Sequence, residues 1–332
     1  MSDAPDGPRT DDPAPNTKST LGSRRADFDA RAQAARHDLE SQIRTRRAQL
    51  GARNEKLTAR TGRNLPAAIA VGVGLGGAVL LSLIFEPAFF MLVAGALIGS
   101  LCFELTSALR FAGRDVPRLP SVLAGLAIVP AAFYGGATGQ WIALLVGIAA
   151  VSAWRLVELA RPSHQKPASV VLRDVGAGAF VQIYCAFLGS FMVLLSAQPN
   201  GAAWTLSALI IVIAVDTGAY ATGLNFGKHP MAPRISPKKT WEGFAGSVAA
   251  SLIAAVLTSW LMLDEPWYFG FLLGGVIIAT ATIGDLSESL IKRDLGIKDI
   301  STWLPGHGGF LDRLDSTLPS AAVAYGLYLI FA

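Results

Sequence analysis

The most unusual polar segment of this sequence is LPGHGGFLDRLDS, at residues 304–316. Asp312 and Asp315 are three residues apart and would be neighbours on one turn of a helix. The glycines at positions 306, 308 and 309 allow the backbone to approach a phosphate closely. Carboxylates beside such a loop are the groups that Mg²⁺ with a nucleotide requires. We therefore predict a metal–polyphosphate site here, and leave His307 open between a structural and a catalytic role.

A second group of polar and charged side chains precedes this segment, at the end of an apolar stretch. Asp285 lies where the stretch ends, so its carboxylate needs a partner or a cation. Ser289 and Lys292 fall close to the same face if the helix continues, and Glu288 can pair with Lys292 at four-residue spacing. We expect this face to belong to the same site.

A third group lies further upstream, in VDTGAYATGLNFGKHPMAPRISPKKTWEG at residues 215–243. Asp216 is a carboxylate inside an apolar run, where a functional role is the default hypothesis. Ser236 and the proline after it resemble a helix N-cap and its first residue. Lys238, Lys239 and Thr240 follow directly, and such a helix start could bind a phosphate. The alternative is that the two lysines only mark the cytoplasmic side.

These groups must be positioned by membrane helices. The chain has 332 residues, of which 52% are hydrophobic and 16% charged, and its mean hydropathy is +0.44. Apolar runs of about 20 residues are long enough to span a bilayer. We predict nine such segments, at about 65–85, 88–110, 119–136, 140–158, 175–196, 203–222, 243–263, 268–286 and 316–332.

The basic residues predict the orientation of these segments. All 28 Lys and Arg residues lie in the N-terminal tail or in, or within about one helical turn of, the connections after segments two, four, six and eight, and none lies in the alternate connections. Because positive residues stay on the cytoplasmic side, we predict a cytoplasmic N-terminus and place Ala332 on the far side. The fold class is thus an all-α polytopic membrane protein. We expect no nucleic-acid partner, because the net charge of +4 is distributed by side of the membrane.

The N-terminal tail, residues 1–64, is predicted to be cytoplasmic and separate from the transmembrane domain at residues 65–332. Residues 1–23 have too few apolar groups for a core and are typical of disorder. Residues 26–60 indicate a solvated helix or short coiled coil, or else a helix on anionic lipid. Cys102 and Cys185 both lie in apolar runs and are interpreted as small core residues.

The polar segments together resemble a known family. From Ser289 to Asp315 the sequence matches the phosphatidate cytidylyltransferase (CDP-diglyceride synthetase) signature without a mismatch over 27 positions. The stretches around Asp216 and Ser236–Gly243 also resemble that family, in the expected order. The motifs cover residues 215–316, and the nine-span layout extends the resemblance to about 65–332.

This resemblance implies an activity and roles for the site. CMP would be transferred from CTP to phosphatidic acid, giving CDP-diacylglycerol and pyrophosphate for phospholipid synthesis. Mg²⁺ would be held by Asp285 and Asp312, and the family allows a second cation. The remaining catalytic candidates are Asp315, Lys292, Arg313 and His307. The substrate-binding candidates are Asp216, Ser236, Lys238, Lys239, Thr240, Ser289, Arg293, Gly308 and Gly309.

The sequence also supports other interpretations. Glu104 could line the lipid entry path or pair with a neighbouring helix. A CTP-dependent polyprenol kinase would share a nucleotide site but accept an alcohol. A transporter would also carry intramembrane carboxylates, although near the midplane and with related halves. We expect location in the cell (inner) membrane with the site facing the cytoplasm, and the family resemblance suggests a homodimer.

Overall fold

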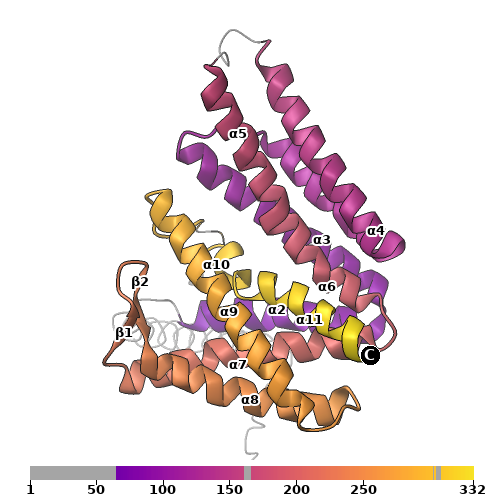
Figure 1. Ribbon diagram of the computed structural model, residues 1–332, viewed down its shortest axis with the longest axis vertical. Coiled ribbons are helices and arrows are strands. Elements are labelled where there is room, and N and C mark those ends of the chain that lie inside the picture. The colour runs from indigo at the N-terminus through magenta and orange to yellow at the C-terminus, as the bar shows by residue number, and fades with distance from the viewer. Residues whose placement is uncertain (1–64, 161–165, 302, 304–307) are drawn as a thin grey trace, which may run out of the picture. The chain divides into compact units, whose positions relative to one another are not determined.

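The computed structural model describes residues 65–160, 166–301, 303 and 308–332, so the expectations for the tail and for His307 lie outside the described residues. The described chain is almost entirely helical (Figure 1). Its elements are α2 (Leu65–Phe85), α3 (Pro87–Phe111), α4 (Arg118–Glu158), α5 (Ala168–Val181), the π-helix η2 (Gln182–Phe187), α6 (Leu188–Ser196), α7 (Gly201–Phe226), β1 (Pro230–Ala232), β2 (Ser236–Thr240), α8 (Trp241–Met262), α9 (Phe269–Asp294), α10 (Leu311–Leu314) and α11 (Thr317–Phe331).

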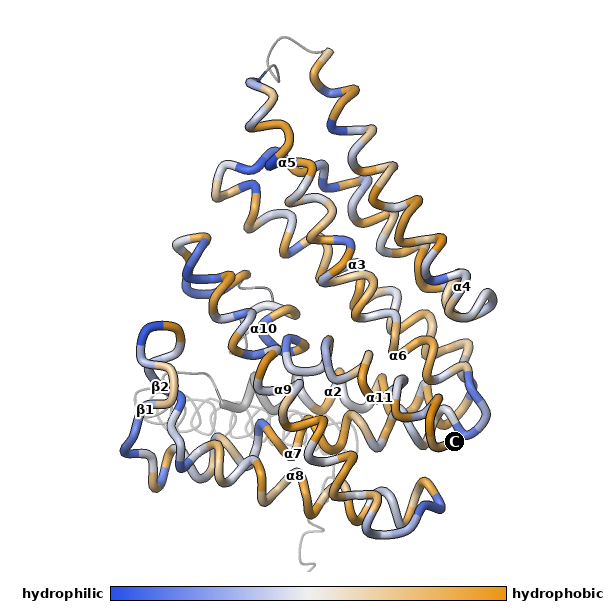
Figure 2. Tube along the Cα trace, viewed as in Figure 1, coloured by the Kyte–Doolittle hydropathy of each residue, from blue (hydrophilic) through white to orange (hydrophobic). Residues whose placement is uncertain are grey.

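The long helices have the length and composition of membrane spans. Seven helical stretches of the described chain qualify, with mean hydropathies between 1.2 and 2.1. Apolar residues cover these helices all round, which is typical of helices in lipid. Figure 2 shows hydrophobic residues along the helices and hydrophilic ones toward their ends and in the β1–β2 hairpin. The protein is therefore an all-α polytopic membrane protein, as predicted.

The longest of these stretches, α4, contains two of the predicted segments. Its 41 residues are interrupted at Gly136, which has φ 59° and ψ −152°. This φ is in the left-handed region, which favours glycine. The chain folds back here, and further along Gly147 packs so closely on Ala124 that a Cβ would lie 3.2 Å from the alanine Cβ. The two arms of α4 thus form a hairpin, with its turn next to the predicted connection around Gly139.

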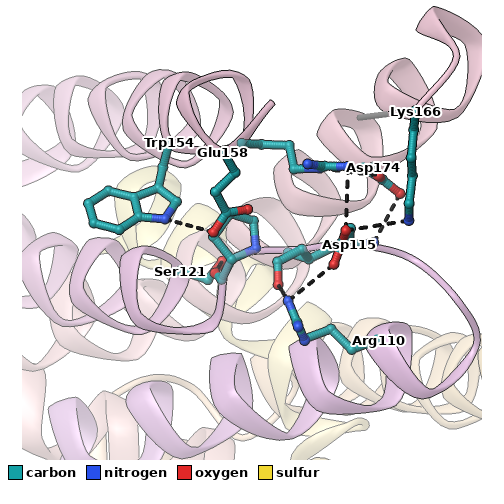
Figure 3. A network of polar contacts seen from close by, with 10 residues as sticks. Arg110, Asp115, Ser121, Trp154, Glu158, Lys166 and Asp174 are labelled. Carbon is teal, nitrogen blue, oxygen red and sulfur yellow. Dashed lines mark hydrogen bonds and ion pairs between the residues drawn. The ribbon is translucent and has the colours of Figure 1, made fainter. Parts of the chain in front are cut away.

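A network of ion pairs joins the connection before α4 to the end of α4 and the start of α5 (Figure 3). The Arg155 side chain, 1% exposed, donates to Asp174 Oδ2 at 2.9 Å. Asp115 lies 3.4–3.5 Å from the cationic groups of Arg110, Arg155 and Lys166. Partial burial alone would raise the pKa of Asp115, but the charges of Lys166, Arg155 and Arg110 outweigh burial and hold this pKa below its usual value. The network brings basic residues of two connections together, as expected for connections on one side of the membrane.

The segment before α8 differs from the prediction. Ser236 is not a helix N-cap, because residues 236–240 form strand β2, which pairs antiparallel with β1. The helix begins at Trp241, and Thr240 is its N-cap, with Oγ1 accepting from the Gly243 N–H at 3.1 Å. Glu242 in the first turn of α8 accepts from the N–H groups of Lys228 and His229 at 3.1 and 3.2 Å. These contacts hold the hairpin against the helix start, so the chain stays extended through Ser236 and Pro237.

Two predicted boundaries also move. The fifth segment begins at Ala168 rather than near residue 175, and passes through η2 before it continues as α6. The sixth continues to Phe226 as α7, so Asp216 lies almost three turns, about 15 Å, before its end. Cys102 and Cys185 are both buried in the hydrophobic core, as predicted.

Candidate active site

The crossing of α9 and the α10–α11 segment positions most of the predicted site. At Gly284 of α9, a Cβ would lie 2.8 Å from Pro319 Cγ and would also meet the backbone of Asp315. The absence of a side chain therefore lets the two helices approach closely at this point. Asp285 is thereby brought near Asp315, and the part of α9 nearer its end is brought near Asp312.

Lys292 connects two carboxylates at this crossing. Its Nζ lies 2.6 Å from Glu288 Oε2 and 2.9 Å from Asp312 Oδ1. The Glu288 and Asp312 side chains are 1% and 7% exposed. The predicted pairing of Glu288 with Lys292 is confirmed, and Asp312 joins it from a segment 20 residues further along the chain.

The glycine turn before α10 contacts carboxylates. Gly308 has φ 83°, and a Cβ there would lie 2.9 Å from Asp312 Oδ2. The Gly309 N–H donates to the same oxygen at 2.8 Å. Both oxygens of Asp312 thus have partners within the protein, one with Lys292 and one with the glycine turn.

Three further carboxylates form what we call the acidic cluster: Asp216 of α7, Asp285 of α9 and Asp315 between α10 and α11. Asp216 is close enough to Asp285 for their charges to interact. Asp315 is within electrostatic range of both other members. Lys239 of β2 forms an ion pair with Asp285. The structure therefore brings Asp285 together with Asp216 and Asp315, while Asp312 pairs with Lys292 nearer the end of α9.

The two lysines of β2 differ in their environment. Successive side chains of a strand point to opposite faces. Accordingly Lys239 contacts the acidic cluster, whereas Lys238 is exposed. Nothing in the sequence distinguishes these two lysines. In this structure Lys239, and not Lys238, faces the carboxylates.

The other predicted residues take different positions around this centre. Arg313 is within electrostatic range of Asp216. The Arg293 Nε donates to the Ile235 carbonyl at 3.2 Å and ties the end of α9 to the hairpin. Ser289 is partly buried on α9. Ser236 and Thr240 have structural positions, in β2 and at the N-cap of α8.

Three buried polar residues near the centre were not in the predicted set. Glu288 was noted only as a partner of Lys292, and its Oε1 has no hydrogen-bond partner among the described residues. Tyr184 of η2 is also buried, and its hydroxyl is likewise unpaired within the described part of the chain. It is within electrostatic range of Asp315 and Asp285. Glu104 of α3 is 1% exposed. The sequence marks Glu104 as unusual because it is a carboxylate in an apolar run. Nothing in the sequence predicts the π-helix that contains Tyr184.

Helices long and apolar enough to span a membrane define a polytopic membrane protein, and carboxylates and lysines gather where α7, α9 and α11 converge. The family model described as the cytidylyltransferase family matches residues 66–331. The chain therefore belongs to the cytidylyltransferase family.

Similar proteins cover most of the chain. A phosphatidate cytidylyltransferase of Mycobacterium leprae is 40% identical over 278 residues, which cover 81% of this chain and 89% of the relative. One of Mycobacterium tuberculosis is 39% identical over 273 residues, with 81% and 83% covered. One of Pseudomonas aeruginosa is 33% identical over 274 residues, with 81% and 96% covered.

Proposed function

We infer that this protein is a nucleotidyltransferase that transfers CMP from CTP to phosphatidic acid, forming CDP-diacylglycerol and pyrophosphate. The observation that carries this inference is the acidic cluster with Lys239 and Lys292 beside it, built from membrane helices of a cytidylyltransferase-family chain. Such a site suits one substrate from the aqueous phase and another whose phosphate lies at the bilayer surface.

The reaction sets a clear electrostatic problem. The phosphate oxygen of phosphatidic acid attacks the α-phosphorus of CTP, and the bond from that phosphorus to pyrophosphate breaks. A phosphomonoester has its second pKa near ~6 and is largely dianionic at neutral pH, so it needs no strong base. The difficulty is to bring two anions together. Positioned cations reduce their repulsion, and fixed geometry supplies much of the remaining rate enhancement.

The oxygen ligands of the acidic cluster have the chemistry that a divalent cation requires. Three carboxylates close together are unfavourable unless a positive charge lies among them, and oxygen-only ligands are those that Mg²⁺ prefers. Among the described residues, however, no three carboxylate, His or Cys side chains are close enough to form a ready metal site. Bound Mg²⁺ would neutralise phosphate oxygens.

We propose Asp285 and Asp312 as the Mg²⁺ ligands, with Asp216 and Asp315 in support, and a second cation as a further component of the site. Asp285 is close enough to the other two members of the acidic cluster for their charges to interact. Asp312 would exchange its contact with Lys292 for the ion, which would leave the Lys292 ammonium group for a phosphate. Arg313 and Arg293 are the further cationic candidates for the two substrates. His307 and the adjoining glycines are proposed for the pyrophosphate region.

The first experiment measures pyrophosphate release from CTP by the purified protein in detergent. Release should require both Mg²⁺ and phosphatidic acid, and CDP-diacylglycerol should form in equal amount. A polyprenol kinase would instead give CDP and a phosphorylated alcohol when a polyprenol is added. A transporter would give no covalent product with either lipid. Either of these outcomes would overturn the proposed function.

The two lysines of β2 provide a matched pair of variants. Lys239→Gln should lower kcat/KM for CTP by roughly 10- to 150-fold, the loss of one charge-assisted contact of ~1.5–3 kcal/mol. Lys238→Gln removes the same charge one residue away, from an exposed side chain, and should change kcat/KM only a few-fold. Equal losses in the two variants would show that general positive charge matters rather than the contact of Lys239 with the site.

The location of the site follows from the charge pattern. We propose that the protein lies in the inner cell membrane with its active site facing the cytoplasm, where CTP is available. A homodimer and the absence of a nucleic-acid partner remain predictions of the sequence.

A further inference from the structure

Glu104 is a carboxylate in the apolar helix α3, and its residue is 1% exposed. A buried carboxylate is costly unless hydrogen bonds or an opposite charge compensate it. The partners of Glu104 come from the segment that carries the predicted signature. Because Glu104 is buried against this segment, it is not one of the lipid-facing residues. Lining a lipid entry path is therefore not its only role.

The carboxylate accepts three hydrogen bonds from that segment. Glu104 Oε1 accepts from Ser301 Oγ at 2.5 Å and from the Phe310 N–H at 3.0 Å. Its Oε2 accepts from the Leu311 N–H at 2.9 Å. The N–H groups at a helix start have no partner within the helix. Glu104 therefore acts as a cap for α10 that is supplied by another helix.

The glycine before α10 is shaped around this carboxylate. A Cβ at Gly309 would lie 2.8 Å from Glu104 Oε2 and 2.9 Å from Ser301 Oγ. Any larger residue at position 309 would displace one of these groups. The absence of a side chain at Gly309 thus has a cause inside the protein, separate from any contact with a phosphate.

We propose that Glu104 is a positioning residue for Asp312. Leu311 directly precedes Asp312, and the Gly309 N–H, held beside Glu104, donates to Asp312 Oδ2. Glu104 also joins Ser301 to Phe310. The proposal rests on the proposed function, because it assigns Glu104 to the geometry of that site and gives it no contact with substrate.

The test compares two equally buried carboxylates. Glu104→Gln keeps the size of the side chain but offers one acceptor oxygen in place of two. Asp174→Asn is the matched control, because Asp174 is also 1% exposed but belongs to the network around Arg155, outside the site. Per folded enzyme, Glu104→Gln should lower kcat by roughly 10- to 100-fold, as expected for a displaced catalytic group. Asp174→Asn should lower the Tm while kcat per folded enzyme stays within about threefold.

A double-mutant cycle tests the close approach directly. Gly309→Ala should lower kcat, because the new methyl group meets the Glu104 carboxylate. Combined with Glu104→Ala, which vacates that space, Gly309→Ala should add little to the loss, since residues that share a contact are not additive. Additive losses, or a Glu104→Gln variant with wild-type kcat, would overturn the proposal.

A measurement without turnover separates this inference from the proposed function. Hydrogen exchange of the Phe310 and Leu311 amides should be faster in Glu104→Gln than in the wild type, and unchanged in Asp174→Asn. If the wild type released no pyrophosphate from CTP but showed this exchange pattern, the proposed function would fail and the cap would stand. Unchanged exchange in Glu104→Gln would reject the cap itself.

Discussion

Replacing Lys292 with methionine should destabilise the protein far more than replacing Lys239. Lys292 is the cation between Glu288 and Asp312, whose side chains are 1% and 7% exposed. Removing one partner of a buried ion pair costs about 3–5 kcal/mol, because an uncompensated charge stays buried. The partner of Lys239 is Asp285, whose side chain is 36% exposed, and for such a pair we expect a loss of about 0–1 kcal/mol.

The assay is thermal unfolding in detergent, followed by tryptophan fluorescence. Lys292→Met should give the larger decrease in Tm, and Lys298→Met, at an exposed position, should give almost none. Adding Glu288→Gln to Lys292→Met should recover part of the loss, because it removes one of the stranded charges. A Lys292→Met protein as stable as the Lys298→Met control would refute the assignment of Lys292 as a buried bridge.

Three further outcomes are expected. Asp285→Asn and Asp312→Asn should each abolish Mg²⁺-dependent CDP-diacylglycerol formation in a folded protein, and the double variant should be little worse; near-normal turnover in either would reject the metal assignment. Thr240→Val should lower stability by about 1 kcal/mol through loss of the N-cap, and Thr240→Ser should restore it; a Tm unchanged in the valine variant would argue against the cap. A cysteine placed at Ser236 should react with a membrane-impermeant reagent only from the cytoplasm, and one at Asn200 only from outside. The reverse pattern would show that the predicted topology is wrong.

The fold was predictable where the signal is local. Apolar runs long enough for a bilayer predict the spans from composition alone. The start of α8 was mispredicted because Ser236 followed by proline has the local pattern of a helix start. The contacts that favour the strand are made by Glu242, in the first turn of α8. Its carboxylate accepts hydrogen bonds from the backbone N–H groups of Lys228 and His229. Such contacts depend on how the β1–β2 hairpin packs against the start of α8, which the local sequence around Ser236 does not predict.

The site was predictable as a set of residues but not as pairs. Motif spacing predicts Asp285, Lys292 and Asp312 as members of one centre. It could not tell that Lys292 would bridge to Asp312, or that Asp285 would lie beside Asp315. These pairings depend on where α9 crosses the last helix, and Gly284 sets that point through a close approach that is visible only in three dimensions.

The cap made by Glu104 also constrains the order in which the protein can be completed during synthesis. Glu104 is separated from its backbone partners by 206 and 207 residues. At about 5–20 residues per second, a ribosome would make these partners roughly 10–40 s after α3. During that time the carboxylate has no cap and is costly in hydrocarbon, so water must hydrate it until its partners arrive. Insertion of the C-terminal segment would then supply the missing hydrogen bonds to Glu104. This insertion would therefore be coupled to assembly of the active site.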